Sequence, residues 1–124
     1  MKNLSTTYPQ AFPAMVYVGG SNWEDEKAST CGWCRTENFE GAVIRKIMKP
    51  SFRIMVQNQR EAERLEKLVH AELDAQFGPR AAVFGCCALR EGAKPNRSDE
   101  WWYCTTSEIE EILTKITIKG DYRE

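Results

Sequence analysis

The sequence predicts a small α/β fold. Three stretches carry this prediction. Met15–Val18 is rich in β-branched and aromatic residues, Phe52–Val56 alternates apolar with polar side chains, and Gln59–Phe77 repeats apolar residues with the period of an amphipathic helix. With 124 residues, of which 42% are hydrophobic and 28% charged, the chain has the length and composition of one globular domain with a modest core.

Charge and hydropathy exclude some classes of protein. No window approaches the ~18 apolar residues of a membrane-spanning helix, and the first residues lack the apolar centre of a secretory signal. We therefore expect a cytoplasmic protein with no membrane association. The net charge is −1, so the chain as a whole lacks the basic bias of many nucleic-acid binders. Any contact with nucleic acid must come from a local patch.

The first part of the chain contains one clear strand. Residues 1–13 hold two prolines and no periodicity, so we expect an irregular arm before a single domain at residues 14–118. The strand Met15–Val18 is followed by Gly19–Ser21, which is a tight-turn sequence. Residues 21–40 mix acids, glycine and two tryptophans. This composition predicts a long loop or a very short helix.

A second strand is expected just before the central helix. Ala42–Met48 fits either a helix or a strand, because periodicity does not decide so short a run. Pro50 ends it in both cases. In Phe52–Val56 the apolar side chains alternate onto one face, which predicts a strand.

The central helix is the best-patterned element. We expect it to begin at Gln59, because Asn58 and Glu61 have the identities of an N-cap and its partner three residues on. It should end at Phe77, before Gly78-Pro79. Its apolar arc contains Ala62, Leu65, Val69, Leu73 and Gln76.

Glu66 and the single histidine, His70, lie one turn apart on this helix. At about 100° per residue, Glu66 falls about 60° from the centre of the apolar arc, which predicts a partly buried carboxylate. His70 is expected slightly further toward solvent. The plain structural interpretation of the pair is a solvated helix face with a contact between residues i and i+4.

The last part of the chain predicts two short strands and a helix. The strands are expected at Ala81–Ala88 and Glu100–Cys104. A helix over Glu108–Ile116 is supported by two overlapping capping boxes, Thr105 with Glu108 and Ser107 with Glu110. Ile116–Ile118 either frays or adds a small strand before a tail at residues 119–124. Of Trp101 and Trp102, we expect one ring in the core and one half-exposed.

Five cysteines leave three interpretations open. An odd number without a secretory signal argues against a disulfide framework. Cys31-Gly-Trp-Cys34 is similar to a redox dithiol, although that motif should follow a strand and begin a helix. Structural zinc and simple burial as thiols are the alternatives. The zinc interpretation joins Cys31 and Cys34 to either Cys86 or Cys87, with Cys104 as the candidate fourth ligand.

Three motifs together resemble the GIY-YIG endonuclease superfamily. They are Tyr17-Val18-Gly19, the helix pattern Glu-Ala-x-x-x-Glu-x-x-aliphatic-His over Glu61–His70, and Glu100-Trp101-Trp102 before a capped helix. The resemblance is greatest to the compact branch found in phages and fungi, and it extends over residues 14–116. It implies an α/β (α+β) fold with a small, mainly antiparallel sheet of three to four strands flanked by helices.

The resemblance also implies a site. The helix glutamate, Glu66, would carry Mg²⁺ or Mn²⁺, with His70 beside it. Tyr17, which matches either of the two tyrosine motifs of the family, would position or deprotonate the attacking water. The arginine that neutralises the transition state would be Arg45 or Arg35, with Arg45 preferred. The expected nucleic-acid contacts are Arg35, Lys46, Asn96, Arg97 and Trp101.

Two functions follow as hypotheses. The first is a metal-dependent nuclease that acts on DNA more readily than on RNA. The second is a catalytically degenerate protein of the same fold that binds nucleic acid, a nucleotide or a protein partner, such as a regulatory or counter-defence factor of phage type. A homodimer is compatible with both, because so short a chain has little surface for reading a nucleic-acid sequence.

Overall fold

An antiparallel sheet with the strand order β3-β1-β2-β6 forms the centre of the structure. The structure is a computed structural model, and it describes residues 13–21, 28–81, 83–84, 97–98 and 100–123. The strands of the sheet are β1 (Ala14–Ser21), β2 (Ser29–Arg35), β3 (Met48–Val56) and β6 (Trp101–Trp102), while β4 (Val83–Phe84) and β5 (Arg97–Ser98) pair separately. The helices are α2 (Phe39–Lys46), α3 (Gln59–Phe77) and α4 (Thr106–Lys119), with a short 3-10 turn, η1, at Thr36–Asn38. The predicted α+β class, with a mainly antiparallel sheet of three to four strands, is confirmed, and the sheet has four strands.

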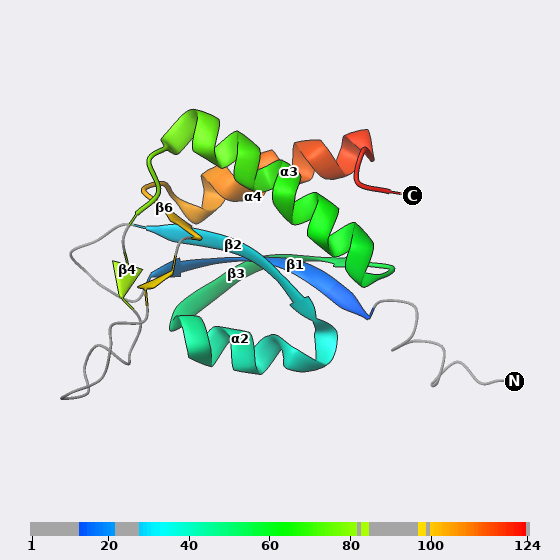
Figure 1. The fold of residues 1–124 in the computed structure, drawn as a ribbon, viewed down its shortest axis with the longest axis horizontal. Helices are drawn as coiled ribbons and strands as arrows, with labels where there is room; N and C mark the ends of the chain where they lie inside the picture. The colour runs from blue at the N-terminus through cyan, green and yellow to red at the C-terminus, as the bar shows by residue number, and fades with distance from the viewer. Residues whose placement is uncertain (1–12, 22–27, 82, 85–96, 99, 124) are drawn as a thin grey trace, which may run out of the picture.

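The helices cover both faces of the sheet. Figure 1 shows α3 and α4 on one face and α2 on the other. Because side chains alternate along a strand, β1 contributes to both layers. Val16 and Val18 pack against α3 and α4, whereas Met15 and Tyr17 belong to a second cluster on the side of α2. β1 is therefore the buried centre of the fold.

The strand β1 is longer than the sequence predicts. It continues through Gly19 and Gly20, where a turn is expected, and its register with β3 shifts between Val18 and Gly19. A Cβ at Gly19 would lie only 2.6 Å from the sulfur of Met48. Glycine here admits the Met48 side chain to the sheet, so the residue marks a close approach rather than a turn.

The expected loop at residues 21–40 contains a strand instead. β2 pairs with β1 along its whole length, and residues Ser29–Cys31 and Cys34 are buried. Both of its faces are covered, so its sequence has no alternation of apolar and polar residues from which a strand could be recognised. Residues 22–27 lie outside the described part of the chain.

The chain forms a helix before β3, and β3 itself includes a proline. Ala42 and its neighbours are helical in α2, which ends where Ile47 takes a left-handed conformation (φ 52°). β3 then begins at Met48 and includes Pro50. The expectation that Pro50 ends an element is wrong, because β3 is the edge of the sheet, where a missing N–H costs no ladder hydrogen bond.

The helix α3 has the bounds that the sequence predicts. The Asn58 side chain accepts a hydrogen bond from the N–H of Glu61 at 2.9 Å, and Glu61 in turn accepts one from the N–H of Gln57 at 3.2 Å. The helix α4 begins with the capping box of Thr105 and Glu108. It runs to Lys119, so Ile116–Ile118 is helical rather than a strand. Among the described residues, no helix is long and apolar enough to cross a membrane.

Removing the cap of α3 should cost stability. We expect Asn58→Ala to lower the free energy of unfolding by about 1 kcal/mol, because the N–H of Glu61 loses its acceptor. Asn58→Asp keeps an acceptor and should stay close to wild type. Urea unfolding followed by circular dichroism measures both, and equal stability of the alanine and aspartate variants would contradict the role of this cap.

Candidate metal centre

The candidate site lies at an open stretch of the β2 edge. β6 pairs only with Ser29 and Thr30, so in the described part of the chain the next residues of β2 have a strand, β1, on one side only. Two side chains of α3 take the place of a strand. The Nε2 of His70 is 2.6 Å from the carbonyl oxygen of Cys31, and the N–H of Trp33 donates to Glu66 Oε2 at 3.0 Å.

Helix geometry explains why these two residues fit the edge. Four residues of an α-helix rise about 6 Å, which is close to the ~6.8 Å that two residues of a strand cover. A pair at i and i+4 on α3 can therefore serve two backbone groups of β2 that are two residues apart. The spacing of Glu66 and His70 thus has a structural role in protecting a sheet edge.

A third residue, Glu100, joins the pair from the chain just before β6. One ligand atom from each of Glu66, His70 and Glu100 lies within 4.8 Å of the others. His70 is 9% exposed, so the expectation that it leans toward solvent is wrong. Its ring lies 4.8 Å from that of Trp102, which covers it. Glu66 and Glu100 are partly exposed, so the cluster is open to a small ion.

The donor set fits a divalent cation. A ring nitrogen must carry hydrogen to bond a carbonyl oxygen, so Nε2 of neutral His70 is the donor to Cys31, and Nδ1 carries the lone pair. Backbone carbonyls commonly orient metal-binding histidines in this way. Carboxylates suit Mg²⁺ and Mn²⁺, and imidazole favours transition metals, so Mn²⁺ matches both kinds of ligand.

The electrostatics of the cluster favour an added positive charge. Burial, together with the nearby charge of Glu100, raises the pKa of Glu66 to about 7. Burial also lowers the pKa of His70, which keeps its ring neutral and able to bind a metal. A cation between the two carboxylates would relieve the repulsion that raises the pKa of Glu66.

Lys46 reaches the same cluster from the last turn of α2. Its Nζ lies 2.6 Å from Glu100 Oε1 and 3.2 Å from Thr30 Oγ1. It also lies 5.2 Å from the centre of the Tyr17 ring. Burial lowers the pKa of Lys46, but Tyr17 and Glu100 outweigh this effect and hold the pKa above its usual value. Lys46 is therefore a charged ammonium beside the acidic cluster.

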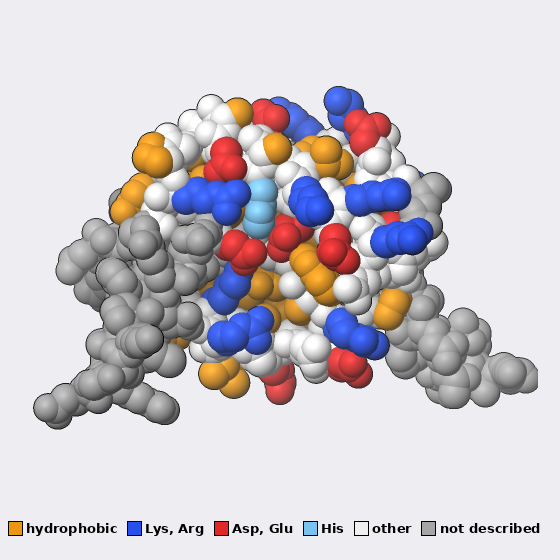
Figure 2. Space-filling view, in the orientation of Figure 1, with side chains coloured by type: hydrophobic (Ala, Val, Ile, Leu, Met, Phe, Trp, Pro, Cys, Tyr) orange, Lys and Arg blue, Asp and Glu red, His pale blue; other side chains and the backbone are white. Residues whose placement is uncertain are grey.

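Basic side chains surround the acidic centre. Figure 2 shows the single histidine, His70, on one face of the molecule, with acidic side chains beside it and Lys and Arg side chains around them. The exposed cations on the two helices of this site include Arg45 on α2 and Arg64 and Lys67 on α3. An acidic centre within a basic surround suits a metal ion that binds together with a polyanion.

The structure separates several residues that the sequence groups together. Tyr17 lies on the α2 face of β1 and is buried, and it reaches the cluster only through Lys46. Arg45 is exposed on α2, and Arg35 pairs with Glu37 at 3.3 Å on the surface. Lys46, predicted as a nucleic-acid contact, is the cation that the structure brings to the acidic cluster.

Other expected contacts with nucleic acid have different outcomes. Trp101 is 1% exposed and packs in the cluster on the α2 side, so it cannot stack on a base. Trp102 is buried as well, and its Nε1 donates a hydrogen bond to Asp74 at 2.9 Å. The prediction that one of the two indoles is half-exposed is therefore wrong. Asn96 lies outside the described residues, and Arg97 is placed only as part of β5.

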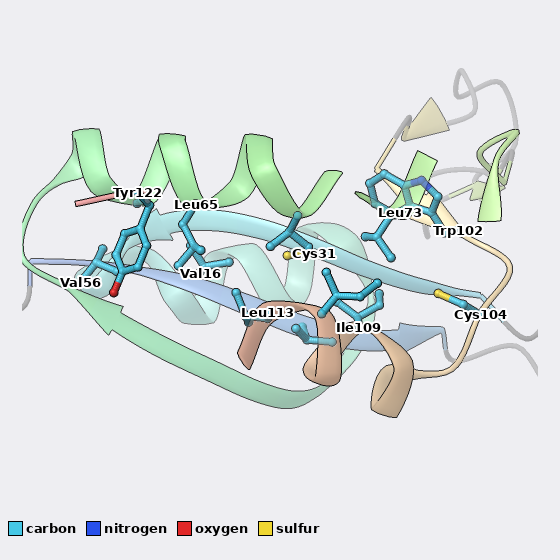
Figure 3. Close-up of a cluster of buried hydrophobic side chains, with 14 of the residues drawn as sticks. Val16, Cys31, Val56, Leu65, Leu73, Trp102, Cys104, Ile109, Leu113 and Tyr122 are labelled. Carbon is cyan, nitrogen blue, oxygen red and sulfur yellow. The ribbon is translucent and has the colours of Figure 1, made fainter. Parts of the chain in front are cut away.

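The cysteine pair does not form the expected two-ligand zinc knuckle. Cys31 packs with the apolar side chains between the sheet and the helices α3 and α4, as Figure 3 shows, whereas Cys34 belongs to the cluster on the α2 side. Residues three apart in a strand point to opposite faces, so one ion cannot bind both sulfurs. Burial raises the pKa of both thiols. Cys86 and Cys87 lie outside the described residues.

Sequence reasoning missed Glu100 and Gly32 as residues of the site. Glu100 belongs to the motif Glu100-Trp101-Trp102, and its position directly before two strand tryptophans is the signal that could have identified it. Gly32 lies opposite Tyr17 in the sheet. A glycine inside a strand indicates a close approach of another group, here the Tyr17 hydroxyl. Comparison of the chain with family models, with curated proteins and with solved structures gives no match.

Proposed function

We propose that this protein is a divalent-metal-dependent nuclease that cleaves phosphodiester bonds, with DNA as the preferred substrate. The observation that carries the proposal is the convergence of Glu66, His70 and Glu100, whose ligand atoms lie within 4.8 Å of one another at the β2 edge. The basic surround of the cluster supports a polyanionic substrate. The sequence resemblance to GIY-YIG endonucleases points to the same chemistry.

The side chains of the cluster would have different roles in the cleavage reaction. A divalent cation at the cluster would supply Lewis acidity at the scissile phosphate and charge stabilisation for the leaving oxygen. His70 is held in one tautomer by the Cys31 carbonyl, which keeps the ligand geometry fixed. Lys46 would supply the positive charge that the family resemblance assigns to an arginine.

Tyr17 has a smaller part in this proposal than the sequence alone suggests. Its ring is buried, and burial raises its pKa, so its hydroxyl keeps its proton and is a poor base. It packs against Lys46 and holds that side chain toward Glu100. We therefore assign Tyr17 to the positioning of Lys46.

Nicking of supercoiled plasmid DNA in MnCl₂ tests the proposal. Wild type should nick the plasmid, EDTA should stop it, and Glu66→Gln should lower the rate by about 100-fold or more, because the cluster loses a charged ligand. Glu72→Gln is the matched control, since it removes an exposed carboxylate of the same helix. Equal rates for wild type and Glu66→Gln would contradict the proposal, as would no nicking across single-stranded, supercoiled and branched DNA.

A non-catalytic binding protein is the second candidate. The observation that favours it is the placement of Arg35 and Arg45, neither of which pairs with the acidic cluster in the described residues. Such a protein would bind DNA in a cation-dependent way without cutting it. Fluorescence anisotropy with labelled DNA in MnCl₂ distinguishes the two, because binding without any nicked product favours this candidate.

A further inference from the structure

Lys46 already serves as a counter-ion within the acidic cluster. The Lys46 side chain is 10% exposed, and its Nζ lies 2.6 Å from Oε1 of Glu100. Glu100 is at the same time one of the three residues whose ligand atoms converge. One carboxylate therefore serves both the lysine and the candidate cation site.

Surrounding residues fix the Lys46 ammonium at this point. It lies over the Tyr17 ring and beside Thr30 Oγ1, while the Thr30 hydroxyl also donates to the Glu100 backbone carbonyl. Gly32 leaves room for this arrangement, because a Cβ there would lie 3.0 Å from Nζ and 2.5 Å from the Tyr17 hydroxyl. The ammonium therefore has contacts with Tyr17 and Thr30 in addition to its ion pair with Glu100.

We propose that Lys46 is the built-in counter-ion of this centre, which pairs with Glu100 while no divalent cation is bound and turns to the substrate phosphate when a cation takes Glu100. This inference rests on the proposed function. The physical reason is charge: two carboxylates near one ammonium carry a net negative charge, and a doubly charged ion competes directly with Lys46 for Glu100. Once released, the ammonium is a point charge well suited to a phosphate oxygen.

The proposal predicts that removing the lysine strengthens cation binding. In calorimetric titrations with MnCl₂ at pH 8.5, Lys46→Met should bind Mn²⁺ about tenfold more tightly than wild type, because a competing charge is gone. Methionine keeps an unbranched apolar stem against Tyr17. Lys46→Arg keeps the charge and should stay within about twofold of wild type.

Arg45→Met is the matched control for long-range electrostatics. It removes the same charge from the neighbouring residue, which is exposed on α2. A change of about twofold or less is expected there, because exposed charges are screened by salt. Unchanged or weaker Mn²⁺ binding by Lys46→Met overturns the exchange, even when wild type binds Mn²⁺ and Glu66→Gln does not. No Mn²⁺ binding by wild type overturns the proposed function as well, so the two failures are distinguishable.

A second measurement uses the wild-type protein and does not depend on a variant. Acetic anhydride labels exposed lysines, and mass spectrometry gives the labelling rate of each. We expect MgCl₂ to raise the rate at Lys46 severalfold, while the exposed Lys49 and Lys67 serve as internal references. A rate at Lys46 that does not rise relative to these references overturns the release of Lys46 from Glu100.

In the nicking assay, Lys46→Met should be slower than wild type at saturating Mn²⁺. An equal rate would overturn the role of Lys46 at the substrate phosphate.

Discussion

Replacing Gly32 by alanine should lower the free energy of unfolding by about 2 to 3 kcal/mol, because the new methyl group overpacks a buried contact. The added Cβ would lie 2.5 Å from the Tyr17 hydroxyl and 2.8 Å from the ring carbon that carries it. Tyr17 cannot move aside at low cost, since its ring is buried between β1 and α2. Lys46 would be displaced with it, so cation-dependent activity should fall too.

Urea unfolding of Gly32→Ala and two companions measures this effect. Gly41→Ala is the matched control: it adds the same methyl group at an exposed position of α2 with no neighbour within 4 Å, so it should stabilise by about 0.5 to 1 kcal/mol. Tyr17→Leu removes the atoms that clash. The double variant Gly32→Ala/Tyr17→Leu should therefore lose less than the sum of the single variants, and simple additivity would contradict the contact.

The part of the fold that sequence patterns predict is the part stabilised by local interactions. The bounds of α3 follow from its apolar period and from Asn58, which forms the expected cap. The start of α4 follows from the capping box of Thr105. β2 cannot be predicted in this way. A strand buried on both faces needs no alternation of apolar and polar residues, and the Ser, Thr, Cys, Gly and Trp residues of β2 carry no strong strand signal.

The candidate site divides in the same way. Glu66 and His70 are recognisable as a pair because four residues of a helix bring them together. Glu100 is 34 positions beyond Glu66 in the printed sequence, and only the pairing of β6 with β2 places it there. The same holds for Lys46, whose neighbour Arg45 has equal local claims. Both residues lie in the last turn of α2, so it is the direction in which each side chain leaves the helix, about 100° apart, that decides which cation faces the acids.

Glu66→Gln should raise stability in neutral solution while it removes activity. In the metal-free protein, burial and the charge of Glu100 raise the pKa of Glu66 from its ordinary value of 4.5 to about 7, although Lys46 and the Trp33 N–H partly oppose this. Such a carboxyl is costly to ionise in the folded state. Since a pKa unit is worth about 1.4 kcal/mol and partial exposure reduces the full value, we expect glutamine to stabilise by about 1 to 2 kcal/mol at pH 8.

The sign of the pH dependence follows from the same shift. Well below pH 4.5 the carboxyl is protonated in both the folded and the unfolded chain, so wild type and Glu66→Gln should not differ there through this group. Between pH 4.5 and about 7 the unfolded chain loses the proton first, and wild type loses stability relative to the variant. Above pH 7 the difference should remain constant. Urea unfolding in EDTA at several pH values measures it, with Glu72→Gln as the exposed control.

Adding Mn²⁺ at pH 8 should reverse the order of the two proteins. Wild type should gain stability, because a ligand that binds only the folded state stabilises it by mass action. Glu66→Gln lacks a charged ligand and should gain little. If Glu66→Gln were no more stable than wild type in EDTA at pH 8, the ionised Glu66 carboxylate would not destabilise the folded state. If Glu66 is a metal ligand, its charge should destabilise the metal-free protein and stabilise the folded state once a cation binds. A glutamate that only protects the edge of β2 should not show this reversal.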